Sequence, residues 1–265
     1  NLPKSSKFKF YDESLSKKLI KKLIKKIDVV IHLAATTDAA SSIGQLEKIK
    51  VNNFENTKLI SDFCASNNKK MIFVSSTSVY GSSDEIMYED DDNLNPQSPY
   101  ADIKISEEKY IQKLNKNKKL KSLILRFGTI VGFSYGMRFH TAVNKFCYQA
   151  SVGLPLSVWK TSMNQKRPYL GLTDACRSIE FFLKKKKFDG QTYNVLSKNL
   201  SVKDIIQTIK TKKNIKIQMV NSKIMNQLSY TVSRKKIEKL KFKFKDDLNK
   251  IILKELKHFD NLNSA

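Results

Sequence analysis

The chain contains 265 residues, 40% of them hydrophobic and 10% aromatic, so it can bury a full core and is not an intrinsically disordered polymer. Lys and Arg total 49 against 25 Asp and Glu, which gives a formal net charge of +24 and would suit an anionic partner. Only five of these cations are arginine, and no lysine-rich stretch carries interleaved stacking aromatics, so we do not expect nucleic acid as a partner.

Three apolar stretches in the first half of the chain predict buried strands. Residues 28–33, 71–75 and 120–127 are apolar at consecutive positions, as in parallel strands that are covered on both faces. Helical periodicity occupies the segments between and beside them, namely residues 14–26, 46–64 and 100–114. Because strand and helix alternate, we expect an α/β fold with a doubly wound parallel sheet.

The rhythm changes after Gly132, which indicates a smaller second lobe. The expected elements there are a helix over 138–150, a strand over 156–158, a helix over 173–185, a strand over 192–196, a helix over 202–210 capped by Ser201, a strand over 215–220 and lysine-rich amphipathic helices in the remainder. We therefore predict one domain over residues 1–133 and a lobe mainly over 134–265, from which residues 168–196 return to the first sheet.

Small and hydroxyl-bearing residues follow each predicted strand of the first domain. The segments are HLAATT at 32–37, SSTSVYG at 75–81 and GTIVG at 128–132. In an open parallel sheet, ligands bind beyond the carboxyl ends of the strands, so these loops predict a site for a flat, polar ligand. Each loop by itself is equally consistent with a tight turn.

Tyr100 and Lys104 are four residues apart at the start of a predicted helix and share one face. An ammonium near a phenol favours the ionised phenol, which is a general base for an alcohol proton. His32 is interpreted as a packed residue at a strand end, and Asp174 as a residue that complements the charge at the start of a helix.

The three cysteines, Cys64, Cys147 and Cys176, are an odd number without metal spacing, which argues against a disulfide framework and a zinc site. No run approaches the roughly 18 to 20 apolar residues of a membrane span, and the opening NLPKSSKFKF has no signal-peptide core. We expect a cytoplasmic protein without a metal and without a membrane partner.

Six motifs in order resemble those of the extended short-chain dehydrogenase/reductases, in particular the NAD-dependent sugar-nucleotide epimerases and dehydratases. They are DVVIHLAA, VNNFENT, SSTSVYG, YADIK, RFGTIVG and QKRPYLGLTDA. The resemblance implies a Rossmann-type sheet with a C-terminal substrate-binding lobe, NAD as cofactor, a nucleoside-diphosphate sugar as substrate, and a homodimer formed through the helices at 46–64 and 100–114.

Site residues follow from the same resemblance, position by position. It implies that Ser76, Tyr100 and Lys104 are catalytic. The cofactor would contact Asp12, Leu33, Ala34, Ala35, Thr37, Asn53, Ser75, Tyr100, Lys104 and Gly128. The substrate would contact Ser76, Thr129, Asn144 and Arg167, and a guanidinium such as that of Arg167 can bind two phosphate oxygens at once.

Two features of the chain depart from the family pattern. The glycine-rich loop G-x-x-G-x-x-G is not in the 265 residues, and the match begins at Asp12, so about 50 residues with the first βαβ unit are expected upstream and the chain as given is expected to bind NAD poorly. Thr77 and Ser78 stand where the family's dehydratases have an Asp-Glu pair, which favours epimerisation.

We therefore expect an NAD-dependent epimerase, acting at C4 of the sugar and serving surface-polysaccharide synthesis. Two alternatives stay open at this point. One is another reaction of the same family, by a nucleotide-sugar reductase, decarboxylase or dehydratase. The other is an NAD-binding protein without catalytic activity.

Overall fold

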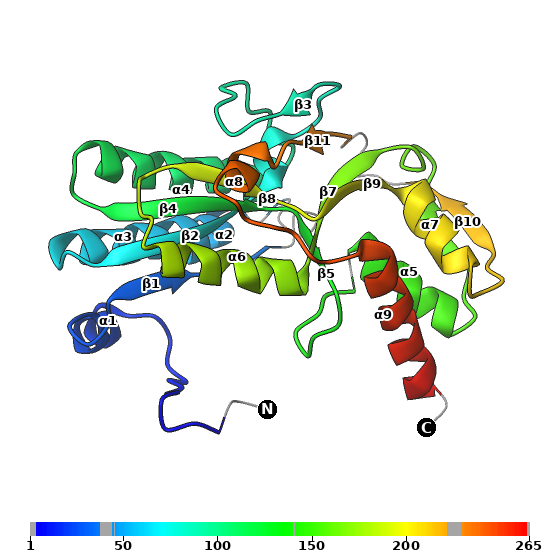
Figure 1. Ribbon diagram of the computed structural model, residues 1–265, viewed down its shortest axis with the longest axis horizontal. Coiled ribbons are helices and arrows are strands. Elements are labelled where there is room, and N and C mark those ends of the chain that lie inside the picture. The colour runs from blue at the N-terminus through cyan, green and yellow to red at the C-terminus, as the bar shows by residue number, and fades with distance from the viewer. Residues whose placement is uncertain (1–3, 38–43, 45, 140, 222–228, 264–265) are drawn as a thin grey trace.

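The computed structural model describes residues 4–37, 44, 46–139, 141–221 and 229–263. The described chain forms two lobes that lie side by side (Figure 1). Its strands are β1 (Val29–His32), β2 (Lys70–Ser76), β3 (Ile86–Met87), β4 (Lys121–Phe127), β5 (Thr129–Val131), β6 (Leu156–Trp159), β7 (Lys166–Gly171), β8 (Thr192–Val195), β9 (Lys198–Ser201), β10 (Ile217–Val220) and β11 (Thr231–Val232).

Its α-helices are α1 (Lys17–Ile24), α2 (Leu46–Ile49), α3 (Asn56–Ser66), α4 (Pro99–Lys116), α5 (Ala142–Ser151), α6 (Leu172–Lys185), α7 (Val202–Lys210), α8 (Lys235–Lys239) and α9 (Leu248–Asn263). A π-helical turn, η1 (Lys50–Glu55), joins α2 to α3, and a 3-10 turn, η2 (Thr77–Tyr80), follows β2. Among the described residues, no helix is long and apolar enough to cross a membrane.

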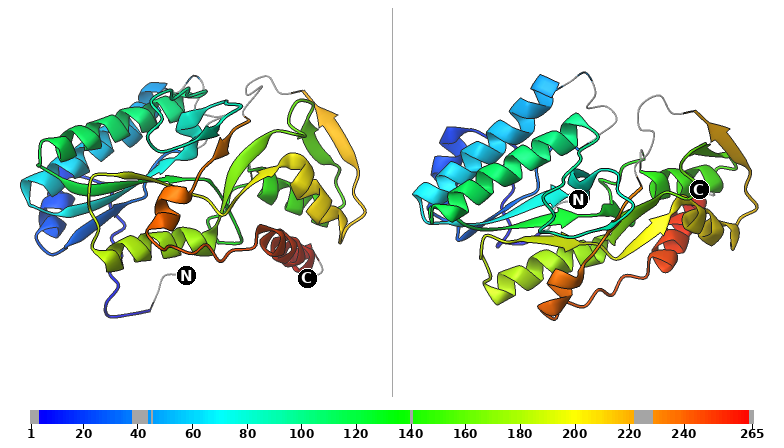
Figure 2. Two further views of the ribbon diagram at one scale, coloured as in Figure 1. Left: turned by 45° about the horizontal axis from the view of Figure 1, so that its top comes forward. Right: turned by 90° about the horizontal axis from the view of Figure 1, so that it is seen from above.

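The first lobe is built on a four-stranded sheet with the order β1-β2-β4-β8, in which every pairing is parallel. Helices α3 and α4 cover one face, and α6 and α8 cover the other (Figure 2). Neighbouring residues of one strand point into opposite cores. In β2, Met71 and Phe73 pack with α1, α3 and α4, whereas Ile72 packs with α6 and α8. The predicted doubly wound α/β fold is thereby confirmed.

The second lobe contains α5, α7, α9 and the parallel pair β6 and β10. Helix α7 begins at a capping box, in which Ser201 accepts from the Asp204 amide and the Asp204 carboxylate accepts from the Ser201 amide. A three-stranded sheet with the order β5-β7-β9 lies between this lobe and the first. Strand β5 follows β4 and leads into the second lobe, and β7 leads from that lobe back to α6.

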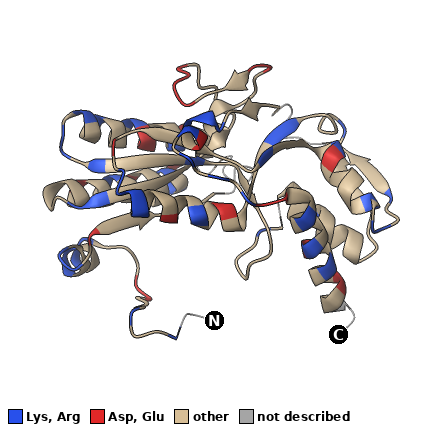
Figure 3. Ribbon diagram, in the orientation of Figure 1, with Lys and Arg blue, Asp and Glu red and all other residues tan. Residues whose placement is uncertain are grey.

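The described C-terminal segment returns to the first lobe before it ends on the second. Strand β11 pairs with β3, and α8 contacts β8 on the large sheet. Helix α9 then packs against α5 and α7. Lys and Arg side chains occur on helices of both lobes (Figure 3).

The structure differs from the expected elements in three respects. The helix expected over 46–64 is interrupted by the π-helical turn at Lys50–Glu55. The helix expected over 138–150 begins at Ala142, and just before it the Thr141 hydroxyl donates to the Arg138 carbonyl at 3.1 Å. Five short strands, β3, β5, β7, β9 and β11, were not expected; β5 directly follows Gly128, and β7 includes Pro168.

Candidate active site

Ser76 and Tyr100 meet at the carboxyl edge of the large sheet. Ser76 is the last residue of β2, and Tyr100 lies in the first turn of α4. The Ser76 side chain interacts with the Tyr100 hydroxyl and lowers the pKa of this phenol. The Ser76 oxygen also accepts from the Ser78 amide at 3.2 Å, which fixes the start of the turn after β2.

The start of α4 is defined by its own sequence. The Ser98 hydroxyl accepts from the Ala101 amide at 3.2 Å as the N-cap, and Pro99 occupies the first helical turn, where no amide hydrogen is needed. Tyr100 is therefore held at a fixed place above the sheet edge, with only 8% of its surface exposed.

Lys104 lies one turn further along α4 and is buried. Its ammonium is 2.9 Å from the Glu107 carboxylate and 3.4 Å from the Val74 carbonyl. It also lies over the rings of Phe73 and Tyr100, at 4.6 and 5.9 Å from their centroids. The structure therefore brings Ser76, Tyr100 and Lys104 together, as the motifs imply, and adds Glu107 beside them.

The electrostatic surroundings of Tyr100 oppose its ionisation in this structure. Burial raises the pKa of Tyr100 above its usual range, and the negative charge of Glu107 raises it further. The hydrogen bond from Ser76 and the positive charge of Arg138 act in the opposite direction. Arg138, in the turn before α5, is thus a cation at this site that the sequence motifs did not identify.

A second phenol completes the edge of the site. Tyr230, just before β11, is buried with its hydroxyl 3.4 Å from that of Thr77, which itself donates to the Phe127 carbonyl at 3.3 Å. Burial raises the pKa of Tyr230, and the hydrogen bond with Thr77 and the positive charge of Arg167 on β7 partly offset this. Thr77 and Tyr230 are 153 positions apart, so nothing in the local sequence could have predicted their contact.

The loop after β1 is held by Asn53. The Asn53 carboxamide accepts from the Thr36 amide at 2.8 Å and donates to the Thr36 carbonyl at 3.0 Å. Its polar atoms are therefore engaged with the loop backbone, and the π-helical turn is what points this side chain at the loop. Leu33 and Ala34 are exposed at the end of β1, and Ala35 is half-buried.

Gly128 has a packing reason to be glycine. A Cβ atom at this position would lie 2.9 Å from the Pro168 carbonyl oxygen, so the missing side chain allows β7 to pass close to the end of β4. From the sequence, we expected this glycine to allow the approach of a ligand. In the structure, the neighbour that approaches it is the protein backbone.

Three buried hydroxyl oxygens at the sheet edge have no hydrogen-bond partner among the described residues. They are Thr37 Oγ1 after β1, Ser75 Oγ in β2 and Ser78 Oγ in η2. A buried polar atom without a partner is costly, and several of them together indicate groups that a polar ligand completes.

The remaining predicted site residues lie on other elements of the chain. Asp12 is exposed in the segment before α1, which runs below the sheet (Figure 1). Thr129 begins β5 and pairs with Tyr169. Asn144 is buried in α5 and donates to the Arg138 carbonyl at 2.9 Å, so its amide holds the turn that carries Arg138.

Two residues interpreted as structural are buried in hydrogen-bond networks. His32 Nε2 lies 2.9 Å from the Thr57 hydroxyl. The Asp174 carboxylate accepts from the amides of Lys245 and Asp246 at 3.0 and 2.9 Å and pairs with Arg177 at 2.5 Å. Asp174 therefore joins the start of α6 to the C-terminal segment, a larger role than complementing one helix.

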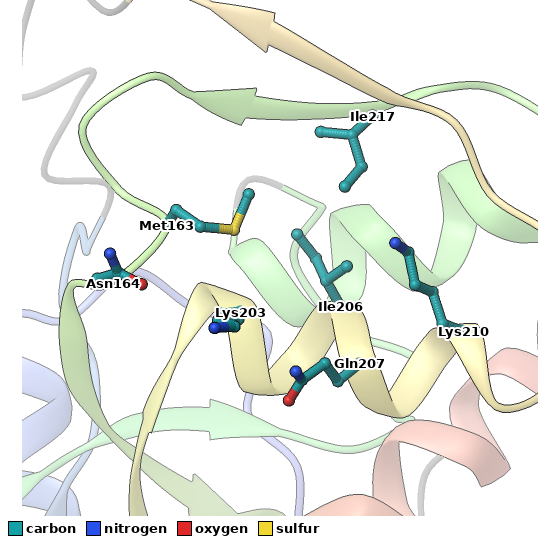
Figure 4. Close-up of a pocket in the computed structure, with 7 residues that line it drawn as sticks. All are labelled: Met163, Asn164, Lys203, Ile206, Gln207, Lys210 and Ile217. Carbon is teal, nitrogen blue, oxygen red and sulfur yellow. The ribbon is translucent and has the colours of Figure 1, made fainter.

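A separate hollow of about 420 Å³ lies in the second lobe between α7, β10 and the loop after β6 (Figure 4). Its lining residues are Met163, Asn164, Lys203, Ile206, Gln207, Lys210 and Ile217. None of them is a predicted site residue, so this hollow is distinct from the sheet-edge centre.

The sequence matches the model of one protein family over residues 5–195, described as the NAD dependent epimerase/dehydratase family. A dTDP-D-glucose 4,6-dehydratase of Dictyostelium discoideum is 30% identical over 213 residues, which cover 72% of this chain and 47% of the relative. A UDP-glucose epimerase of Bacillus subtilis, described as uncharacterized, is 27% identical over 74% of this chain and 61% of its own length. The chain thus spans about half to three fifths of these relatives.

Solved structures of epimerases with bound NAD share the fold of this chain. The UDP-glucuronic acid 4-epimerase of Bacillus cereus, in complex with UDP-glucuronic acid and NAD, superimposes with a TM-score of 0.82 at 25% identity, over 92% of this chain and 78% of that one. The UDP-glucose 4-epimerase of Thermus thermophilus, in complex with NAD, shares the fold with a TM-score of 0.79 at 19% identity, over 91% and 80% of the two chains. Since the family model covers well over half of the sequence, the chain belongs to the NAD-dependent epimerase/dehydratase family.

Proposed function

We propose that this chain carries the catalytic centre of an NAD-dependent epimerase that inverts one hydroxyl-bearing carbon, C4, of a nucleoside-diphosphate sugar. The observation that carries the proposal is the placement of Ser76, the last residue of β2, beside Tyr100 in the first turn of α4, with the Lys104 ammonium 5.9 Å from the centroid of the Tyr100 ring. A serine and a phenol in this arrangement can bind one substrate hydroxyl between them and remove its proton.

The residues at the sheet edge fit NAD. The hydroxyls of Thr37, Ser75 and Ser78, which have no partner in the described part of the chain, can bind polar groups of the nucleotide, and the exposed residues Leu33 and Ala34 leave room for a flat ring system. When bound, NAD supplies the hydride acceptor and donor of the reaction and a positive charge near Tyr100.

The protein's own groups handle the proton. We infer that ionised Tyr100 takes the proton of the C4 hydroxyl as the C4 hydrogen leaves as hydride, so that C4 becomes a ketone. Ser76 binds the same oxygen in both states. After the sugar turns over, the hydride returns to the opposite face and Tyr100 gives the proton back, so the reaction has no net consumption of cofactor.

The second lobe supplies substrate contacts in this proposal. The positive charge of Arg167 on β7 lowers the pKa of both Tyr169 and Tyr230, which burial raises. A guanidinium there suits the diphosphate of the substrate, and Thr129 and Asn144 lie on the neighbouring β5 and α5. The setting in surface-polysaccharide synthesis, the cytoplasmic location and the homodimer are parts of the same proposal.

Dehydration is the rival reaction, and the Dictyostelium relative favours it. Loss of water from C6 requires an acid and a base near that carbon. The position after Ser76 is Thr77, whose hydroxyl is already engaged by Phe127 and lies near Tyr230. This arrangement supports epimerisation over dehydration.

The proposal is tested with the protein expressed from its complete gene. Incubated with UDP-glucose, UDP-glucuronic acid or UDP-N-acetylglucosamine, the protein should convert at least one to its C4 epimer, seen by chromatography without accumulation of NADH. Tyr100→Phe should lower the rate about 10²-fold or more because the base is removed.

Tyr110→Phe is the matched control, because this tyrosine of the same helix bonds Asp62 at 2.5 Å outside the site. It should retain the rate of the unsubstituted protein. Full activity of Tyr100→Phe would refute the mechanism, and a 4-keto-6-deoxy product would establish the dehydratase instead.

A further inference from the structure

A chain of buried polar side chains runs from the catalytic centre through three elements. The Lys104 ammonium on α4 is 2.9 Å from Glu107, and the Thr57 hydroxyl on α3 donates to the same carboxylate at 2.5 Å. His32 Nε2 at the end of β1 lies 2.9 Å from Thr57 Oγ1. All four side chains are buried, so water does not screen their interactions.

The hydrogen-bond directions in this chain follow from counting hydrogens. The Thr57 hydroxyl has one hydrogen, which it donates to Glu107, so it accepts from His32 and Nε2 carries the ring hydrogen. Burial and the nearby Lys104 lower the pKa of His32 to about 4, so the ring is neutral at neutral pH. The two oxygens of Glu107 lie next to different partners. Oε1 accepts from the Thr57 hydroxyl, and Oε2 is 2.9 Å from the Lys104 ammonium.

Glu107 also acts on the catalytic phenol. Tyr100, Lys104 and Glu107 share one face of α4, and the carboxylate opposes ionisation of Tyr100. Its ion-pair partner Lys104 lies over the ring of the same phenol, with the ammonium 5.9 Å from the ring centroid. The other titratable or charged groups that act on Tyr100 are Arg138 and Tyr230, from the turn before α5 and the segment before β11.

We propose that Glu107, oriented by Thr57 and His32, is a positioning residue that holds the Lys104 ammonium on the Val74 side of α4 and thereby restrains ionisation of Tyr100. This inference rests on the proposed function for the role of Tyr100 as base. Nothing in the YADIK motif assigns a role to Glu107, which lies three residues beyond Lys104.

The test measures the titration of Tyr100 directly, without cofactor or substrate. Tyr100 is replaced site-specifically by trifluorotyrosine, whose more acidic phenol titrates in an accessible pH range, and the 19F resonance is followed against pH. Glu107→Gln should shift the titration to lower pH by about one unit or more, since a nearby negative charge is removed and the ammonium is left.

Asp102→Asn is the matched control, because it removes an exposed carboxylate from the same helix. It should leave the titration unchanged. Superimposable curves for Glu107→Gln and the otherwise unsubstituted protein would overturn the proposal.

Two further variants cover the case in which Glu107→Gln does not fold because Lys104 is left unpaired. The double variant Lys104→Met with Glu107→Gln removes both charges and should fold, as judged by circular dichroism. Thr57→Val should shift the Tyr100 titration to lower pH by less than Glu107→Gln, because a carboxylate with one donor fewer holds a proton more readily, and Thr57→Ser should restore it. Failure of the double variant to fold, or a Thr57→Val curve equal to that of the unsubstituted protein, would also overturn the proposal.

The outcomes separate this inference from the proposed function. A shifted titration in a protein that converts no sugar nucleotide would support the role of Glu107 and refute the epimerase. An active epimerase in which Glu107→Gln leaves the Tyr100 titration unshifted would support the proposed function and refute the role of Glu107.

Discussion

Glu107 and Glu108 are adjacent on α4 but serve different partners. Glu107 binds Lys104 at the catalytic centre, whereas Glu108 accepts from Arg126 of β4 at 2.7 Å. Arg126 also donates to the Tyr80 hydroxyl at 2.8 Å, so this second pair holds the turn after β2 in place. The arginine of the RFGTIVG motif is therefore buried in an ion pair and stabilises the turn after β2.

Arg138 is the residue whose replacement should reveal how Tyr100 becomes a base. Removal of its charge in Arg138→Met raises the pKa of Tyr100, so less phenolate is present at neutral pH. The rate at pH 7 should fall about tenfold for every pH unit by which the pKa of Tyr100 rises, and the pH-rate profile should move to higher pH. Arg138→Lys keeps the charge and should retain most of the activity. A profile that is unmoved in Arg138→Met would show that the charge has no influence on the base.

The residues of the candidate active site differ in how far sequence could predict them. Ser76 and Tyr100 stand in motifs next to a strand end and a helix start, and both positions follow from local pattern. Glu107 had a signal in its spacing of three from Lys104, which places it on the same helical face. Tyr230 had none, because its contact with Thr77 depends on how the C-terminal segment returns to the first lobe.

At the scale of elements, α6 is anchored by two carboxylates. Asp246 accepts from the Asp174 amide at 2.8 Å at the start of the helix, and the Asp174 carboxylate accepts from the backbone of Lys245 and Asp246. This reciprocal arrangement ties the C-terminal segment to the junction of β7 and α6. It requires that Gly171, at that junction, has no side chain.

Gly171→Ala should therefore destabilise the protein. A Cβ atom there would overlap the Asp246 carboxylate and lie 2.5 Å from Asp246 Cβ, so the segment would have to move. We expect a loss of about 1 to 3 kcal/mol in the free energy of unfolding, measured by urea denaturation. Gly136→Ala is the control, since no atom lies within 4 Å of its added Cβ, and it should unfold at nearly the same urea concentration as the unsubstituted protein. Equal losses for both glycines would contradict the packing argument.

The large sheet was predictable because β2 and β4 are continuous apolar runs that need burial on both faces. The elements around Gly128 and Pro168 were not, because strands of three to six residues are too short to show a clear periodicity, and proline is uncommon in strands. The start of α5 was placed too early for a similar reason. Residues 138–141 have a composition that suits a helix, but the Thr141 side chain closes a turn before the helix begins.

At the scale of the whole molecule, one carboxyl group links stability to pH. Glu255 of α9 is buried, and burial raises its pKa to about 7, although the Gly132 amide partly offsets this. An unfolded glutamate titrates near pH ~4.3. Between these values the folded protein binds one more proton than the unfolded chain, so the contribution of Glu255 to stability falls as pH rises from about 4.3 to 7.

Glu255→Gln should remove this pH dependence. At pH 8 the variant should be more stable than the unsubstituted protein by about 2 to 4 kcal/mol, because it no longer buries a charge, and at about pH 4.5 the two should be nearly equal. The free energy of unfolding is measured by urea titration at both pH values. A constant difference between the two proteins at all pH values would show that Glu255 does not titrate in this way.

The return of the C-terminal segment to the first lobe affects the order in which the protein can fold during synthesis. Val79 and Tyr80 of the turn after β2 pack against Tyr230 and Val232, which are translated about 150 codons later. Until then, the ribosome-bound chain can form the large sheet but leaves this apolar turn uncovered. The turn after β2 is thus among the last parts of the first lobe to be covered, and its apolar side chains stay exposed on the nascent chain until Tyr230 and Val232 have been translated.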